Sequence, residues 1–500
     1  MMWMLHVLIS ALLYKIGSVW CHECPAKCVC EAAASVQCFG VQSVPSGIAG
    51  GVRRLNLVYN NIEEIKGREL SGLPGLEEVI LSSCGLEQVE ANAFRVQKHL
   101  KWLDLQKNKL PIIPRALPSS LKDLNLGHNQ IHTLQESALH GLRRLRVLNL
   151  QNNLITTVRS SSLSALLKLE TLYLDGNKIK AIQGVLRLPV LTWLSLANNK
   201  ISSLPSAFFS SVQHLKTLDV SSNLLTKLPH NLPQALVHLN LNRNQIRSLK
   251  NRDLTRLSDL STLAVCNNRL VSVDRGLRLP HLTVLELAGN QLRVLPSRLS
   301  SNLQKVDCGQ NQIQEVTYQH LSGLRQLRHL FLENNTIQQF EPDALKDCVH
   351  LTNLALEQNL LSTFPHGLPE SLVRLDLKAN CITTIQEHAL KPLKRLQVLN
   401  LRNNRLSSLP AMSLLPRLRT LYLEGNLWNC TCELLKVKRA LLNRDVDMSA
   451  EFCTEPVHTS LDIWQVYIMA QEMCEEQSRE FLPESHTVNT DNEEYDDYDL

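Results

Sequence analysis

Aromatic residues and long apolar runs are scarce in this chain. Phe, Trp and Tyr make up 5% of the 500 residues, and no run of 18 apolar residues follows the first twenty. A transmembrane helix needs about 20 such residues, so no membrane insertion is expected. The motifs G-x-S-x-G, H-E-x-x-H and G-x-x-x-x-G-K are missing, and the 17 His lack ligand-like spacing. We therefore expect no enzyme, cofactor, metal site or nucleic-acid partner.

One phrase, L-x-x-L-x-L-x-x-N-x-L, fills most of the chain instead. It occurs seventeen times within residues 52–428, with Val, Ile, Cys or Trp in some Leu places. Its Asn recurs at intervals of 21, 22 or 24 residues, and Cys84 takes the second place. The Asn series is Asn60, Asn108, Asn129, Asn153, Asn177, Asn199, Asn223, Asn244, Asn268, Asn290, Asn311, Asn335, Asn359, Asn380, Asn404 and Asn426.

The x-L-x-L-x part of each repeat alternates as a half-buried strand does. A unit of about 24 residues cannot bury its own leucines, so neighbouring units must stack. The Asn amide can satisfy backbone groups at the bend after the strand, and stacked copies would form a ladder. The sequence therefore predicts an α/β leucine-rich-repeat solenoid, a curved horseshoe with a parallel β-sheet on its concave face and disulfide caps at both ends.

The length of each repeat predicts whether its segment on the convex side is extended or helical. Four short units carry one or more prolines after the Asn, at residues 110–118, 228–233, 295–299 and 364–369. Proline fixes φ and has no N–H, so these segments should be extended. Units of 24 residues, such as the one with residues 160–168, have room for a short helical turn.

Clusters of four cysteines flank the repeats. We expect an N-terminal cap at residues 21–51 and a C-terminal cap at 429–474, each with its first cysteine paired to its third and its second to its fourth. A redox or zinc motif at Cys21-His-Glu-Cys24 is the alternative, but it lacks a second pair at ligand spacing. The cap cysteines are Cys24, Cys28, Cys30 and Cys38 at the front and Cys430, Cys432, Cys453 and Cys474 at the back.

The remaining cysteines are single. Cys84 and Cys308 are expected to be buried thiols. Cys266 is expected on the concave strand, where it could be reactive. A bridge between Cys348 and Cys381 is left open.

Disulfide caps require an oxidising compartment. Residues 1–20 fit a signal peptide, because an apolar core at 7–14 precedes the small residues Gly17 and Ser18. We expect a secreted protein of the extracellular space or matrix.

Charge is unevenly distributed. The chain has a net charge of +5, yet residues 475–500 contain ten acidic residues and one Arg. That segment is expected to be a disordered acidic tail, and its Tyr495 and Tyr498 are possible sulfation sites. The basic remainder could bind heparan-type polysaccharide, and the tail could fold back onto it. Basic residues gather in the C-terminal third, at Lys391, Lys394, Arg395, Arg402, Arg405, Arg417, Arg419, Lys436, Lys438 and Arg439.

The concave face is the expected binding surface. Large aromatic residues anchor many protein interfaces, although they can also simply cover neighbouring strands. Asn334-Asn-Thr336 is a glycosylation sequon at the end of a strand. The aromatic residues at exposed strand positions are Trp102, Tyr173, Trp193, Phe331 and Tyr422.

The front cysteine cluster, the mixture of 21- and 24-residue units and the single secreted domain resemble the small leucine-rich proteoglycans. The resemblance covers nearly the whole chain, although seventeen repeats exceed that family's usual number. It implies binding of collagen or growth factors, particularly transforming growth factor beta. The favoured hypothesis is a soluble modulator that captures such a factor on the concave face. The alternative is a structural matrix protein that binds collagen fibrils.

Overall fold

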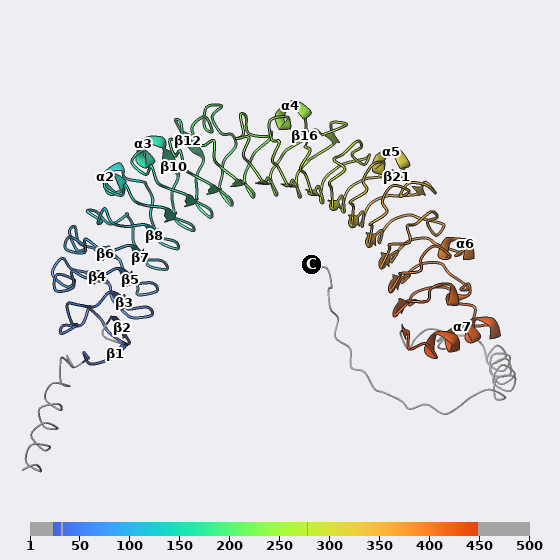
Figure 1. The fold of residues 1–500 in the computed structure, drawn as a ribbon, viewed down its shortest axis with the longest axis horizontal. Helices are drawn as coiled ribbons and strands as arrows, with labels where there is room; N and C mark the ends of the chain where they lie inside the picture. Colours follow the sequence, from blue (N-terminus) through green and yellow to red (C-terminus); the bar gives the residue numbers. More distant parts are fainter. Residues whose placement is uncertain (1–23, 32–33, 278, 449–500) are drawn as a thin grey trace, which may run out of the picture.

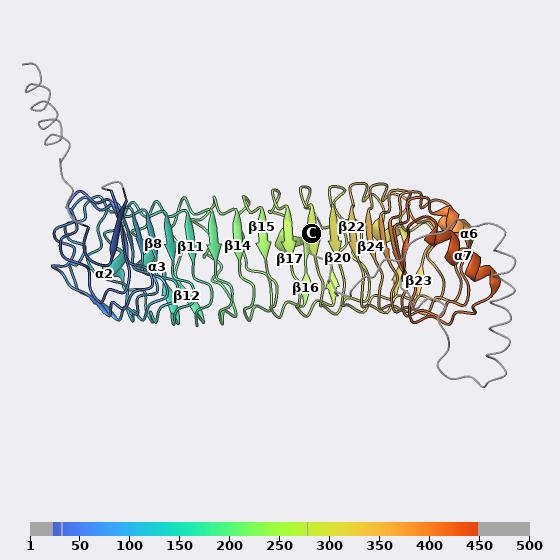
Figure 2. The ribbon, with the colours of Figure 1, turned by 90° about the horizontal axis from the view of Figure 1, so that it is seen from below.

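The computed structural model describes residues 24–31, 34–277 and 279–448. They form one arc, with a sheet along its inner side and loops and short helices along its outer side (Figure 1). Viewed from below, each strand runs across the width of the solenoid, and consecutive strands lie side by side along its length (Figure 2). The predicted curved horseshoe with a parallel concave sheet is confirmed.

Each of the seventeen repeats contributes one short strand to this sheet. Consecutive strands are parallel and pair with their central Leu or Val residues in register, as Leu148 pairs with Leu172 and Leu172 with Leu194. The strands are β3 (Arg54–Asn56), β5 (Glu78–Ile80), β7 (Trp102–Asp104), β8 (Asp123–Asn125), β9 (Val147–Asn149), β11 (Thr171–Tyr173), β13 (Trp193–Ser195), β14 (Thr217–Asp219), β15 (His238–Asn240), β17 (Thr262–Ala264), β19 (Val284–Glu286), β20 (Lys305–Asp307), β22 (His329–Phe331), β24 (Asn353–Ala355), β25 (Arg374–Asp376), β26 (Val398–Asn400) and β27 (Thr420–Tyr422).

The leucines of the repeat form a continuous core between the sheet and the convex side. In the repeat around β9, the side chains of Leu145, Leu148, Leu150 and Ile155 are all 0% exposed. Side chains of this kind contribute roughly 1.5–3 kcal/mol each when fully buried. Because every turn contributes the same set, the core extends along the arc and each turn depends on its neighbours for burial.

The repeat asparagines hold consecutive turns together through their backbones. Asn153 Nδ2 donates to the carbonyl oxygens of Leu126 (2.9 Å) and Leu150 (3.1 Å), while its Oδ1 accepts from the Ile131 N–H (2.9 Å). Each amide thus bonds to main-chain groups in its own turn and in the preceding one. The ladder therefore runs through the backbone rather than from one Asn side chain to the next.

Cys84 interrupts this ladder. Its thiol donates to the Leu57 carbonyl oxygen at 2.9 Å, where an Asn amide N–H donates in other repeats, but Cys84 has no side-chain oxygen to accept an N–H in return. The Ile62 N–H, which an Asn side chain would otherwise accept, donates to the Cys84 carbonyl oxygen at 2.9 Å. The chain thus compensates for the missing amide with a main-chain bond.

The convex side follows repeat length. The four-residue helices lie in units of 24 residues, and the proline-containing segments of the four short units contain no helix. Two- and three-residue strands also occur on this side and pair in parallel, and three of them directly precede helices in the same units. The helices are α2 (Glu136–Leu139), α3 (Ser160–Leu163), α4 (Asn251–Leu254), α5 (Tyr318–Leu321), α6 (Glu387–Leu390) and the 3-10 helix η1 (Met412–Leu414), and the paired strands are β4 (Glu64–Ile65) with β6 (Gln88–Val89), β10 (Thr157–Arg159) with β12 (Ala181–Gln183), β16 (Ser248–Leu249) with β18 (Ser272–Val273) and β21 (Glu315–Val316) with β23 (Gln339–Phe340).

The N-terminal end of the sheet is closed by an antiparallel pair, β1 (Cys28–Glu31) and β2 (Ser35–Cys38). Strand β2 also pairs in parallel with β3, which joins this cap to the first repeat. Disulfides link Cys24 to Cys30 and Cys28 to Cys38. The expected pairing of first with third and second with fourth cysteine is confirmed at this end.

At the C-terminal end, α7 (Cys432–Leu442) and β28 (Asp447–Met448) follow the last repeat. Strand β28 pairs with β27, and Arg444 donates to the carbonyl oxygens of Met412 (3.0 Å) and Leu415 (2.6 Å). Cys430 and Cys432 are both disulfide-bonded. The other two expected cap cysteines, Cys453 and Cys474, lie outside the described residues, as do the expected signal peptide and acidic tail.

The remaining described cysteines are free thiols. Cys348 and Cys381 do not form the bridge that the sequence left open. Cys266 lies just after β17 rather than on it, and burial raises the pKa of its thiol to about 12. The expectation of a reactive thiol at Cys266 is therefore wrong, because the thiolate is the nucleophile and burial opposes its formation.

Candidate functional site

The concave surface is a grid of three rows of side chains. Each repeat contributes one side chain to each row. The first-row residue directly precedes the central residue of the strand, the middle-row residue directly follows it, and the last-row residue lies two positions after the middle-row residue. In the repeat of β11 these residues are Thr171, Tyr173 and Asp175. Because the strands pair in register, each row runs along the length of the arc.

This grid is acidic, although the chain as a whole is basic, with a net charge of +5. Eleven of its side chains are acidic and five are basic. A potential of one sign along a concave surface attracts ligands of the opposite charge. The acidic members are Glu78, Asp104, Asp123, Asp175, Asp219, Glu286, Asp307, Glu333, Glu357, Asp376 and Glu424, and the basic members are Arg54, Lys305, Arg374, Lys378 and Arg402.

Part of the middle row serves the fold rather than a ligand. Asp and Asn side chains there accept the N–H of the residue two positions later, as Asp219 Oδ1 does from Ser221 N at 2.8 Å. Neighbours in the row also bond to each other, with Asn240 Nδ2 3.1 Å from Asp219 Oδ2. This second polar ladder was not foreseen, although the frequency of Asp and Asn at this one repeat position was visible in the sequence.

The expected aromatic residues do lie on concave strands. Trp102 is 50% exposed and Trp193 is 41% exposed. Tyr173 and Trp193 lie on adjacent strands with ring centroids 6.5 Å apart, so they form one patch. Trp102 stands apart from that patch, because β8 and β9 lie between its strand and β11.

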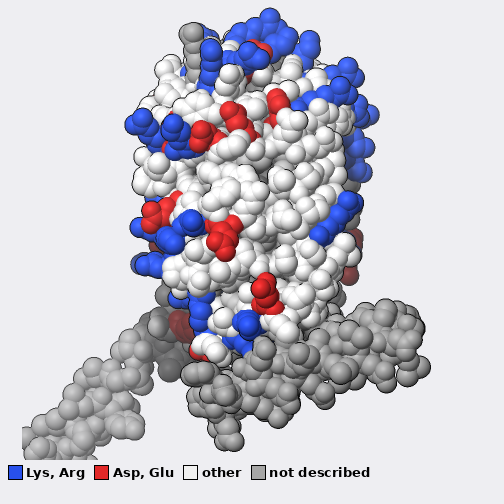
Figure 3. Space-filling view, turned by 90° about the vertical axis from the view of Figure 1, so that its right-hand side faces the viewer, with Lys and Arg blue, Asp and Glu red and all other residues white. Residues whose placement is uncertain are grey.

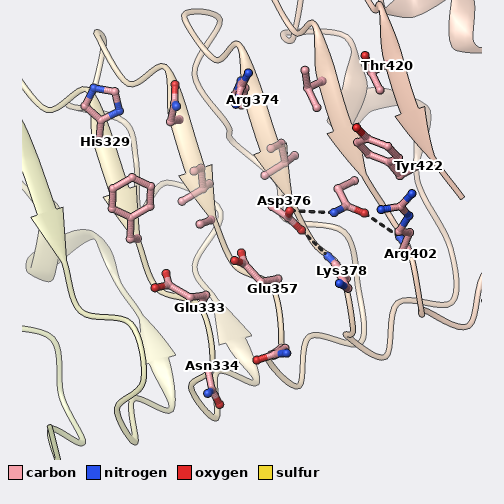
Figure 4. A pocket seen from close by; sticks show the side chains of 18 of the residues that line it. His329, Glu333, Asn334, Glu357, Arg374, Asp376, Lys378, Arg402, Thr420 and Tyr422 are labelled. Atoms are coloured by element: carbon pink, nitrogen blue, oxygen red, sulfur yellow. Dashed lines mark hydrogen bonds between the residues drawn. The ribbon is translucent and has the colours of Figure 1, made fainter. Parts of the chain in front are cut away.

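Phe331 and Tyr422 belong to a second feature, a hollow of about 750 Å³ on strands β22 to β27 (Figure 4). The hollow opens where the middle row passes from Phe331 through the small side chain of Ala355 to Asp376. We call this the concave hollow. The sequence placed aromatic residues on this face, but it gave no sign of this cavity.

Two cation–aromatic contacts flank the concave hollow. The Arg402 guanidinium lies 4.2 Å from the centre of the Tyr422 ring and is paired with Glu424, with Nε 2.7 Å from Oε2. That hydrogen bond raises the pKa of Arg402. At the other side, Lys305 Nζ lies 5.5 Å from the Phe331 ring and 2.9 Å from Glu286 Oε1.

Glu333 lies between these contacts. Its Oε2 is buried and has no hydrogen-bond partner, and burial raises the pKa of the carboxyl group to about 6. Glu357 occupies the same row in the next repeat, beside Glu333 (Figure 4). The ring of His329, with its pKa lowered by burial, stacks on Phe331 with centroids 6.2 Å apart.

The glycosylation sequon lies at the rim of this hollow (Figure 4). Asn334 is exposed and has a positive φ of 50°. Its N–H donates to the Glu357 carbonyl oxygen at 2.9 Å, which fixes the turn. The side chain is therefore accessible to a glycosyl transferase, and a glycan there would stand beside the hollow.

The expected basic cluster is divided between surfaces. Arg402 lies in the concave hollow, whereas Lys391, Lys394, Arg395, Arg417 and Arg419 are exposed and lie outside the concave grid. On the side of the molecule formed by the C-terminal repeats, Lys and Arg collect along the edges and towards the apex of the arc, around a mostly uncharged middle that also carries some Asp and Glu (Figure 3). The possible sulfation sites, Tyr495 and Tyr498, lie outside the described residues.

Within the described part of the chain, no helix is long and apolar enough to cross a membrane. The same residues contain no group of three or more His, Cys, Asp or Glu side chains that could hold a metal ion.

Comparison with known proteins identifies the repeats. The family model described as "Leucine rich repeat" matches residues 119–179, 189–234, 301–361 and 370–427. Mouse nephrocan is 43% identical over 455 residues, covering 91% of this chain and 89% of that protein. Human podocan-like protein 1 is 29% identical and covers 81% of this chain and 73% of that protein.

Solved structures share the fold. A Leptospira interrogans leucine-rich-repeat protein superposes with a TM-score of 0.64 at 23% identity, covering 80% of this chain and 96% of that one. Toll, in its complex with Spatzle from Drosophila, superposes with a TM-score of 0.69 at 21% identity, covering 82% of this chain and 59% of that one.

Proposed function

Because the chain belongs to the small leucine-rich proteoglycan family, whose members are extracellular leucine-rich-repeat proteins, we propose that it is secreted and modulates growth-factor signalling. It would do so by capturing a ligand of the transforming growth factor beta type on its concave face. The matched family and fold serve as binding scaffolds rather than enzymes. The proposal gives the concave grid the role of a protein interface.

The observation that carries this proposal is the placement of large aromatic side chains in the grid. Trp193 and Trp102 are 41% and 50% exposed, although burial in a core would have removed their apolar surface from water. Exposed aromatic side chains on a rigid sheet can bind a partner with little loss of conformational entropy. The acidic side chains around them would favour a basic partner.

Heparan-type polysaccharide would bind elsewhere under this proposal. A polyanion is repelled by the acidic grid, so its place is the exposed basic surface that includes Arg395, Arg417 and Arg419. Glycosylation of Asn334 and sulfation of Tyr495 and Tyr498 are parts of the same proposal, because a secreted chain passes the enzymes that add these groups.

The test is binding of the mature secreted protein to immobilised growth factors and to fibrillar collagen. Trp193→Ala and Tyr173→Ala should weaken growth-factor binding at least tenfold, and convex Tyr318→Ala, a 36%-exposed aromatic, should not change it. Collagen binding that is unaffected by the concave variants, with no factor bound, would contradict capture and favour the matrix-protein alternative.

A further inference from the structure

We propose that the concave hollow is a subsite for one lysine or arginine side chain of the partner protein, with the Glu333 carboxylate as its ionic acceptor. This inference rests on the proposed function, because it adds the chemistry of one contact to ligand capture. Under this proposal, the partner protein must place a Lys or Arg side chain at the concave hollow.

The carboxylate of Glu333 occupies a space that is open because residue 309 is a glycine and has no Cβ atom. A Cβ atom added to Gly309, in the preceding repeat, would lie 2.1 Å from Glu333 Oε1 and 2.5 Å from Cδ. Any other residue at position 309 would push the carboxylate out of this place. The repeat thus forms a defined recess for one acidic group beneath the concave surface.

This recessed carboxylate lacks a partner for one of its oxygens. Oε2 of Glu333 is buried without a hydrogen bond, although a buried carboxylate usually has donors to both oxygens. A cationic N–H group entering the hollow would supply the missing donor and offset the cost of desolvation. Glu333 is one of the residues that line the hollow, and it lies beside Glu357 (Figure 4).

Immediately around Glu333 acidic side chains outnumber basic ones, although Arg374, Lys378 and Arg402 also line the hollow. Glu286, Asp307 and Glu333 share one neighbouring cation, Lys305, which is bonded to Glu286. The pKa of Asp307 is also raised, chiefly by burial and to a smaller extent by the charge of Glu286. A bound ammonium or guanidinium group would balance this excess.

The shape of the hollow fits a long side chain rather than a metal ion. Among the residues that the structure describes, no three potential metal ligands converge. The Phe331 ring and the small Ala355 side chain provide an apolar wall for the methylene groups of Lys or Arg, and the volume is about 750 Å³. The long apolar stem and the charged end of these side chains match the wall and the recessed carboxylate.

The experiment uses the secreted full chain and fluorescent peptides of one neutral sequence with a single central Lys, Arg, norleucine or Glu. Fluorescence polarisation at pH 7.4 should show the Lys or Arg peptide binding more tightly than the norleucine and Glu peptides. Glu333→Gln should weaken the cationic peptide at least fivefold and leave the norleucine peptide unchanged. Glu387→Gln, an exposed carboxylate on the convex helix α6, is the matched control and should have no effect.

A second variant separates position from charge. Gly309→Ala keeps the Glu333 charge but displaces the carboxylate, so it should weaken the cationic peptide as Glu333→Gln does. Gly127→Ala, in the same row two residues after β8, is its control, and unfolding curves establish that each variant is folded. Equal affinity of the wild type and both hollow variants, or tighter binding of the norleucine or Glu peptide, would overturn the proposal. Growth-factor binding that depends on Trp193 would still stand in that case, so failure of this subsite differs from failure of capture.

Discussion

The asparagine side chain of each repeat forms hydrogen bonds with main-chain groups of two consecutive turns. Asn244 Nδ2 donates to the carbonyl oxygens of Val220 and Leu241, each at 3.0 Å, and its Oδ1 accepts from Leu225 N at 2.9 Å. The residue is 7% exposed, so water cannot replace these bonds. Removing the amide would leave buried main-chain groups without partners.

We therefore expect Asn244→Ala to lower the free energy of unfolding by about 3 kcal/mol, since each orphaned group costs about 1–3 kcal/mol. Urea unfolding followed by circular dichroism measures this change. Asn353→Ala, at a half-exposed concave position, is the control and should cost less than about 1 kcal/mol. Equal losses in the two variants would show that the ladder does not stabilise the turns as described.

Glu333 makes the stability of the fold depend on pH. Its pKa is about 6 in the folded chain and near the ordinary 4.5 when unfolded, so ionisation costs more in the folded state. The folded state binds more protons between these values, so stability falls as pH rises from about 4.5 to 6. Lys305, Asp307 and Asp376 act on the same carboxyl group and stay in place in the variant below.

Glu333→Gln should remove this part of the pH dependence and raise the free energy of unfolding at pH 7 by about 1–2 kcal/mol. Thermal unfolding of the wild type and the variant from pH 4 to 7 compares the two slopes. A variant that is less stable than the wild type at pH 7 would show that the ionised carboxylate is not a strained group.

At the scale of elements, the sequence predicted the strands well and the convex side in part. Each strand follows from the spacing of three leucines, and proline fixes the extended segments. The paired strands of the convex side were not predicted, because two or three residues carry too little periodicity. The concave hollow was also out of reach, because it depends on Ala355, Gly309 and Glu333, which lie on different repeats and meet only after stacking.

Gly367 shows how tightly convex segments of adjacent repeats approach each other. Its φ is +68°, and an added Cβ would lie 1.7 Å from the Pro342 carbonyl oxygen. We expect Gly367→Ala to destabilise the fold by more than about 2 kcal/mol, because left-handed strain of about 1–2 kcal/mol adds to the clash. Gly72→Ala, which meets no atom within 4 Å, is the control in urea unfolding. A small and equal effect of both changes would mean that the convex segments can move apart.

At the scale of the whole molecule, stacking separates charge. The same repeats that bring eleven acidic side chains to the concave grid leave most Lys and Arg residues of the described part of the chain on the other surfaces. A basic protein and an acidic polysaccharide could thus bind one chain without competing. The repeat pattern in the sequence already places these acidic residues at concave positions, and the register of the strands aligns them in rows.

The most direct test of concave capture is hydroxyl-radical footprinting of the secreted protein with and without its bound partner. Aromatic side chains react readily, and the chain offers them on both faces. The account predicts that Trp102, Trp193 and Tyr173 become protected while convex Tyr318 reacts as before. Protection of Tyr318, with the concave aromatics equally reactive in both states, would contradict it.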